Sequence, residues 1–183
     1  MHTPVKLALV GPSAVGKDTL AEYLVSQYGF THISTGALLR EYIREHHLGE
    51  PTREILRNTA IELRRAKGAD YFVREASTST AQRLVVSGIR AIPEVEYFKE
   101  MQGIVVGITA PIERRYALAK QRGDVADHLS FEDFQKLEVM EDTGYDREAP
   151  NVQGVMRYAD HLIVNDGSRK DLFKKMDDIM LIC

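Results

Sequence analysis

The chain has 183 residues, a formal net charge of −3 and an apolar content of 44%. This length suits one domain with a substantial core, and the charge lacks the basic excess that binding to nucleic acid requires. No segment approaches the roughly 18 apolar residues of a membrane span. The only cysteine, Cys183, has no partner for an internal disulfide. We therefore expect a cytoplasmic protein with no nucleic-acid and no membrane partner.

Five short segments have the composition of buried strands. Continuous apolar runs such as "VKLALV" and "GIVVGITA" are typical of strands that are covered on both faces, as in a parallel sheet. In chain order, the expected strands are residues 5–10, 31–34, 83–89, 103–110 and 161–164.

Segments with apolar residues at helical spacing separate these strands. The first follows a glycine-rich loop and ends at Gly29, and the last begins where Ser168 and Asp171 form a capping box. Because strands and helices alternate, the sequence indicates an α/β protein in which a parallel sheet lies between two helical layers.

The first expected strand is joined to the first helix by the glycine-rich loop, which reads "GPSAVGKDT" at residues 11–19. Its glycines allow the backbone to curl so that successive N–H groups face one anion, and the positive end of the following helix points to the same place. The motif matches the phosphate-binding loop G-x-x-x-x-G-K-[ST] except at Asp18. We therefore expect the loop to bind ATP, with Lys17 reaching the β- and γ-phosphates. The expected ATP-binding residues of the loop are Gly11, Ser13, Ala14, Val15, Gly16, Lys17, Asp18 and Thr19.

Asp18 stands where the motif has a hydroxyl that binds the metal. A carboxylate is a good ligand of Mg²⁺, directly or through water, and Lys17 and the metal would offset its repulsion of the phosphates. We therefore interpret the loop as functional, and expect Mg²⁺ as a cofactor with Asp18 as its ligand.

The second expected strand leads into "HISTGALLRE", at residues 32–41. This segment resembles the acceptor-binding segment of adenylate kinase and its nucleoside monophosphate kinase relatives. The resemblance implies that Thr35 and Gly36 lie along the acceptor nucleotide and that Arg40 binds its phosphate, for which a planar guanidinium is well suited.

The end of the third expected strand reads "VVSGIRAIPEVEYF", at residues 85–98. This segment resembles phage-type deoxynucleotide kinases and proteins related to dephospho-coenzyme A kinase, and the resemblance implies that Arg90 is a second ligand of the acceptor phosphate. Those relatives commonly carry an acidic residue near the end of this strand, where the present chain has Ser87. We hypothesise that Asp18 supplies the missing carboxylate.

Two later segments complete the expected donor site. Arg115 and Arg122 lie seven residues apart on one helical face, and in the kinases that this chain resembles, lid arginines close over the donor and stabilise the transferred phosphoryl group. The same resemblance implies that Asn165, Asp166 and Gly167 lie beside the donor base.

Taken together, these patterns indicate a single P-loop kinase domain over residues 1–183. The resemblance implies a three-layer α/β/α fold with a five-stranded parallel sheet in the order 2-3-1-4-5, an acceptor-binding helical part at about residues 35–80 and a small helical lid at about residues 112–145.

The expected function is transfer of the γ-phosphoryl group of ATP to a nucleoside or deoxynucleoside monophosphate, with Lys17, Arg90 and Arg122 as catalytic residues. Two alternatives stay open: a dephospho-coenzyme A kinase-like enzyme, and a regulatory nucleotide-binding protein without activity. The expected partner is the small-molecule acceptor alone, bound by a monomer or a homodimer.

Overall fold

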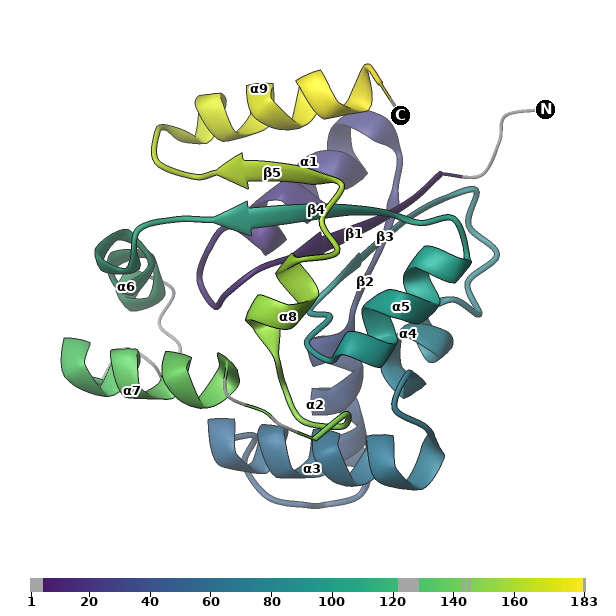
Figure 1. Ribbon diagram of the computed structural model, residues 1–183, viewed down its shortest axis with the longest axis vertical. Helices are drawn as coiled ribbons and strands as arrows, with labels where there is room; N and C mark the ends of the chain where they lie inside the picture. The colour runs from purple at the N-terminus through teal and green to yellow at the C-terminus, as the bar shows by residue number, and fades with distance from the viewer. Residues whose placement is uncertain (1–4, 122–128, 143, 145, 183) are drawn as a thin grey trace.

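The computed structural model describes residues 5–121, 129–142, 144 and 146–182 (Figure 1). In this part of the chain, five strands form one sheet in the order β2-β3-β1-β4-β5, and every neighbouring pair is parallel. The predicted α/β class and strand order are therefore confirmed. The strands are β1 (Val5–Val10), β2 (Thr31–Ser34), β3 (Arg83–Ser87), β4 (Ile104–Thr109) and β5 (His161–Val164).

Both faces of the sheet are buried. In β1, Leu7 and Leu9 pack on one face, whereas Ala8 and Val10 pack on the other. All four side chains are fully buried, because helices cover both faces of a parallel sheet. This burial explains why the strand is apolar at every position from Leu7 to Val10.

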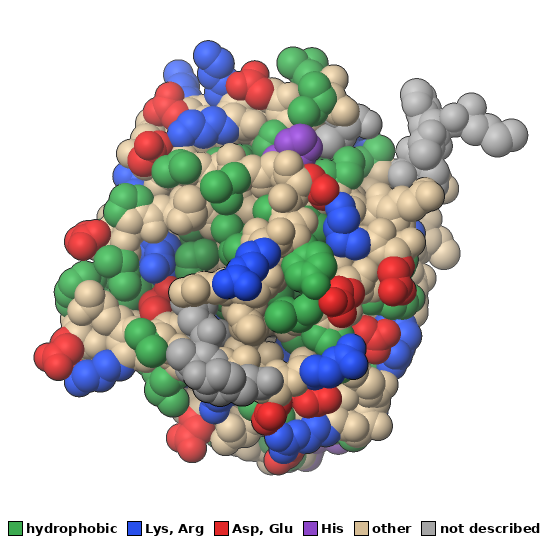
Figure 2. All heavy atoms as spheres, in the orientation of Figure 1, with side chains coloured by type: hydrophobic (Ala, Val, Ile, Leu, Met, Phe, Trp, Pro, Cys, Tyr) green, Lys and Arg blue, Asp and Glu red, His purple; other side chains and the backbone are tan. Residues whose placement is uncertain are grey.

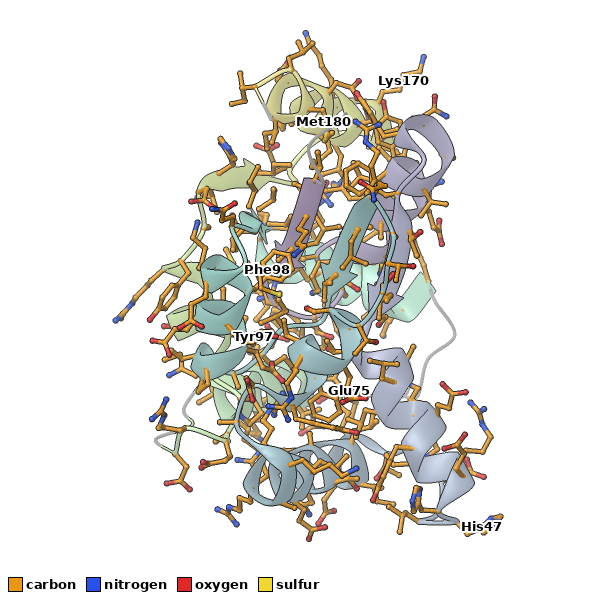
Figure 3. All side chains as sticks on the ribbon, turned by 90° about the vertical axis from the view of Figure 1, so that its right-hand side faces the viewer. His47, Glu75, Tyr97, Phe98, Lys170 and Met180 are labelled. Atoms are coloured by element: carbon orange, nitrogen blue, oxygen red, sulfur yellow. The ribbon has the colours of Figure 1, made fainter. Side chains whose placement is uncertain are left out.

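Helices form a layer on each face of the sheet (Figure 1). On one face, α1 (Lys17–Tyr28) and α9 (Arg169–Met180) bury their apolar sides in one cluster. On the other face lie α4 (Tyr71–Ala76), α5 (Ile92–Glu100) and α8 (Val152–Met156). Phe98 of α5 is fully buried and points into the interior of the molecule (Figure 3).

Two further helix groups lie beyond the sheet. Helices α2 (Thr35–Glu45) and α3 (Arg53–Lys67) pack on each other and on Phe72 of α4. Helices α6 (Ile112–Gln121) and α7 (Phe131–Asp142) pack around Phe134, next to the glycine loop. In Figure 1, α6 and α7 lie on the side to which the arrowheads of β4 and β5 point, where the carboxyl ends of these strands meet the loops.

The structure departs from the expected elements in three places. The third strand ends at Ser87, two residues early, because the chain turns at Gly88, where φ is +86°. Helices α4 and α8 were not expected from the sequence, since they are only six and five residues long and such short elements carry little periodicity.

A buried carboxylate connects α3 to the loop that follows β3. Glu94 Oε1 accepts a hydrogen bond from Arg64 Nε at 2.9 Å, and Glu94 Oε2 accepts bonds from the backbone N–H groups of Arg90 and Ala91 at 3.1 and 3.2 Å. The side chains of Arg64 and Glu94 are only 3% and 0% exposed. Because both charges are removed from water, each depends on the other for compensation.

The face of the molecule shown in Figure 2 carries charges of both signs. In Figure 2, lysine and arginine side chains are interspersed with aspartate and glutamate over the face shown. This distribution agrees with the small net charge of −3.

We predict that Glu94→Gln lowers the free energy of unfolding by about 3–5 kcal/mol, because Arg64 loses its buried counter-charge. Urea denaturation measures this change. The control is Asp146→Asn, which removes the partner of the neighbouring Arg65 in a pair whose side chains are 60% and 67% exposed. The control should change stability little. Similar small effects of both substitutions would contradict the prediction.

Candidate nucleotide-binding site

The glycine loop lies between β1 and α1, as predicted, and it sits directly on β4. A Cβ atom at Gly11 would lie 2.2 Å from the carbonyl oxygen of Ile108, and Gly11 has a φ of +143°. Gly16 precedes α1 with a φ of +105°, and no side chain caps the helix. A helix N-terminus that follows a glycine loop in this way is the arrangement that binds phosphate.

Lys17 extends along the inside of this loop. Its ammonium group donates hydrogen bonds to the carbonyl oxygens of Gly11 and Pro12, at 2.8 and 2.6 Å. The charge of Lys17 is thus held beside the N-terminus of α1, where two sources of positive potential add together.

Two buried side chains hold the glycine loop in place through hydrogen bonds to its backbone. Asn165, at the end of β5, donates from Nδ2 to the carbonyl oxygen of Val15 at 2.9 Å, and its backbone N–H donates to Thr109. Arg115 of α6 donates to the carbonyl oxygens of Ala110 and Ser13, at 3.2 and 3.5 Å. The loop is therefore held by β5 and α6 as well as by its own glycines.

Arg115, predicted to contact the donor, is buried behind the loop. Its guanidinium forms an ion pair with the buried carboxylate of Glu138 on α7 and lies 5.9 Å from the centre of the Phe134 ring. In this position Arg115 connects α6, α7 and the loop. Arg122, the other predicted lid arginine, lies outside the described residues, and both roles stay predictions.

The segment predicted to lie beside the donor base follows β5. Asp166 is exposed and pairs with Lys175 at 2.9 Å, a hydrogen bond that lowers the pKa of Asp166. The carbonyl oxygen of Gly167 accepts a hydrogen bond from Arg114 of α6. Asn165 has a direct structural role in the loop, which the turn-like sequence "NDG" did not indicate.

The end of β3 carries a serine that pairs with a histidine of β2. Ser87 is buried at the end of β3, and its hydroxyl lies 2.8 Å from Nε2 of His32 on β2. Burial lowers the pKa of His32, whereas the carboxylates of Asp18 and Glu22 on α1 oppose this shift. Asp18, His32 and Ser87 are therefore neighbours beside the loop, although the sequence analysis considered only Asp18 and Ser87.

No group of three or more His, Cys, Asp or Glu side chains that could hold a metal occurs among the described residues. A site with few protein ligands nevertheless fits Mg²⁺, which is usually held by one or two carboxylates together with phosphates and water. Asp18 is exposed in the first turn of α1 and can supply such a carboxylate.

The predicted acceptor residues line a cavity of about 570 Å³ next to the loop. Thr35 and Gly36 begin α2, and Gly88 approaches so closely that a Cβ atom there would lie 2.6 Å from the Thr35 hydroxyl. Arg40 turns back along α2 and donates to the carbonyl oxygen of Gly36 at 3.2 Å. Arg90 enters the wall from the loop after β3, and Ser13 joins the cavity to the glycine loop.

The cavity wall also contains residues that the sequence analysis missed. Helix α3 contributes Arg53, Arg57 and Arg64. These residues recur at the spacing of one helical face, but no sequence motif accompanies them. Only their position in the fold identifies them as part of the cavity wall. Apolar side chains form much of the rest of the wall: Leu39, Leu56, Phe72, Leu137 and Met140.

In the described residues, no helix is both long enough and apolar enough to cross a membrane.

We predict that Gly11→Ala weakens ATP binding at least tenfold, equivalent to about 1.4 kcal/mol, because the new Cβ atom would clash with the Ile108 carbonyl group. Isothermal titration calorimetry with ATP measures this effect. Gly29→Ala is the control, because Gly29 also has a positive φ of +68° but has no neighbouring atom within 4 Å of an added Cβ. Unchanged ATP binding by the Gly11 variant would refute the close packing of the loop on β4.

A second prediction concerns acid stability. Since the pKa of folded His32 lies below its unfolded value, its contribution to stability is complete above pH 6.5 and is lost as the pH falls towards the folded pKa. His32→Gln should therefore lose less thermal stability than the wild type between pH 7.5 and 5.5, measured as Tm. An equal loss of Tm in His32→Gln and the wild type between these pH values would contradict the prediction.

Comparison with known proteins identifies the family and the fold. Residues 10–130 match the family model described as an AAA domain. The chain is 31% identical over 184 residues to a UPF0200/UPF0201 protein of Archaeoglobus fulgidus. The match covers 96% of this chain and 54% of that relative, so the chain spans about half the length of the relative. It is also 31% identical over 133 residues to a UPF0200 protein of Methanosarcina mazei, covering 69% of the chain and 70% of that protein.

The fold is similar to that of a shikimate kinase from Acinetobacter baumannii in complex with shikimate. The TM-score is 0.62 at 19% identity, and the match covers 98% of this chain and 94% of the other. At this identity the similarity concerns the fold alone. The matches show that the chain belongs to the AAA-domain family and the UPF0200 proteins, and its strand order is that of the P-loop kinase fold.

Proposed function

We propose that the protein transfers the γ-phosphoryl group of ATP to a nucleoside or deoxynucleoside monophosphate. The observation that carries this proposal is the shared wall between the two expected sites: Ser13 of the glycine loop lines the same cavity as Thr35, Gly36, Arg40 and Arg90. A cavity that only bound ATP would not need cationic side chains opposite the loop.

The proposed donor site is the loop itself. The ATP phosphates would accept hydrogen bonds from the uncapped N–H groups at the start of α1, and Lys17 would neutralise the β- and γ-phosphates. Asp18 would hold Mg²⁺, which supplies further neutralisation of phosphate charge when bound.

The proposed acceptor site lies at the α2 side of the cavity. Arg40 and Arg90 would bind the acceptor phosphate from two different elements and orient one of its oxygens towards the γ-phosphate. Because phosphoryl transfer depends mainly on positioning and charge neutralisation, no covalent intermediate with the protein is required.

The test is ADP production from ATP and Mg²⁺ with a panel of acceptors. The panel contains ribo- and deoxyribonucleoside monophosphates and dephospho-coenzyme A. We predict that one nucleoside monophosphate raises turnover by orders of magnitude and that Lys17→Ala lowers this turnover at least ~100-fold, as expected for removal of a positioned cation from the transition state. Lys136→Ala, which alters an exposed lysine on α7, should leave turnover unchanged.

Two other results of this assay would favour the alternative functions. Stimulation by dephospho-coenzyme A alone would replace the proposed acceptor. ATP binding without stimulation by any acceptor would instead favour a regulatory nucleotide-binding protein.

A further inference from the structure

Arg57 has an unusual environment in the cavity wall. It is half-buried on α3, and its Nε atom is buried without a hydrogen-bond partner among the described residues. A buried guanidinium N–H group that has no acceptor is costly. Because Arg57 also lines the cavity, an anion that enters there can bind its guanidinium group.

Arg64, on the same helix, differs from Arg57 because its guanidinium group has partners within the protein. Arg64 lies two turns further along the same face of α3, where it is paired with Glu94, donates to the carbonyl oxygen of Glu148 and lies 5.1 Å from the centre of the Phe72 ring. The charge of Arg64 is therefore compensated within the protein, whereas no carboxylate in the described chain pairs with Arg57.

The cavity as a whole has an excess of positive charge. Among its described lining residues, the only acidic one is Glu54, whereas the basic ones are Arg40, Arg53, Arg57, Arg64 and Arg90. One carboxylate on a ligand would balance only part of this charge. A phosphate group with two negative charges matches it better, because arginine binds phosphate through several parallel N–H groups.

The apolar part of the wall favours the same class of ligand. Leu39, Phe72 and Met140 line the cavity together with the arginines, so the ligand must combine a charged group with an apolar or planar one. A phosphate monoester with an organic body has this combination, whereas inorganic phosphate lacks the body and shikimate, the ligand of the similar kinase, lacks the phosphate.

We propose that Arg57 is a specificity-determining residue that binds the acceptor phosphate, so that the cavity selects phosphate monoesters over hydroxy acids. This inference rests on the proposed function, since it assigns the cavity to the acceptor. It extends that function by assigning the acceptor phosphate to Arg57, a residue of α3 that no motif marked.

The experiment measures acceptor binding in the absence of ATP. Isothermal titration calorimetry is performed with the wild type, Arg57→Ala and Arg57→Lys, using AMP, dCMP, inorganic phosphate and shikimate as probes. The control is Arg65→Ala on the same helix, because Arg65 is exposed and does not line the cavity. Thermal melting of each variant verifies that it is folded.

We expect at least one of the two nucleotides to bind more tightly than inorganic phosphate and shikimate. Arg57→Ala should weaken this binding about 10- to 100-fold, and Arg57→Lys should restore part of it, whereas Arg65→Ala should bind like the wild type. In turnover assays, Arg57→Ala should raise the acceptor KM with little change in kcat or in the KM for ATP.

Several results would overturn the inference. Equal nucleotide binding by Arg57→Ala and Arg65→Ala would remove Arg57 from the site, and tighter binding of shikimate than of both nucleotides would reject the ligand class. Binding of neither nucleotide to the folded wild type would also reject it.

Different results would reject the proposed kinase function and the proposed role of Arg57. Turnover with a nucleotide whose KM does not depend on Arg57 would leave the proposed function intact and reject this inference. Nucleotide binding that depends on Arg57, without turnover, would retain phosphate recognition and reject the kinase function.

Discussion

The buried carboxylate of Glu94 determines how the acceptor side of the molecule is assembled. One of its oxygens binds Arg64 on α3, and the other binds the backbone at Arg90 and Ala91. A single charge thus fixes both the helix that lies farthest from the sheet and the loop that carries a predicted acceptor ligand. Because neither Arg64 nor Glu94 is compensated by water, separating them is costly. The cavity between these elements therefore has a defined shape before any ligand enters.

The donor side depends on steric contact more than on charge. Gly11 lies so close to β4 that no side chain fits, and Asn165 holds the loop from β5 through the Val15 carbonyl group. These contacts come from strands on one side of β1, whereas the predicted acceptor residues come from α2, the loop after β3 and α3 on the other. The glycine loop lies between the two groups, at the carboxyl end of the central strand, where open α/β sheets commonly bind ligands.

The residues around Asp18 bear on why the loop has a carboxylate where the motif has a hydroxyl. Where related kinases have an acid on β3, this chain has Ser87, whose hydroxyl lies at hydrogen-bond distance from His32. The carboxylate lies instead at the start of α1, close enough to oppose the lowering of the His32 pKa. A carboxylate near the N-terminus of a helix is also favoured by the helix dipole. The negative charge beside the loop is thus present, although it is carried by a different element.

The sequence by itself determined the α/β class, the positions of the strands and the phosphate loop, because periodicity and glycine spacing are local properties. Thr35, Gly36, Arg40 and Arg90 could be predicted from two short motifs, and the structure places all four around one cavity. Only the tertiary structure decided that Arg57 lines this cavity, because arginines on a helix surface look alike in a sequence. Burial and pairing distinguish them: Arg64 has a carboxylate partner in the core, Arg65 faces water, and Arg57 faces the cavity.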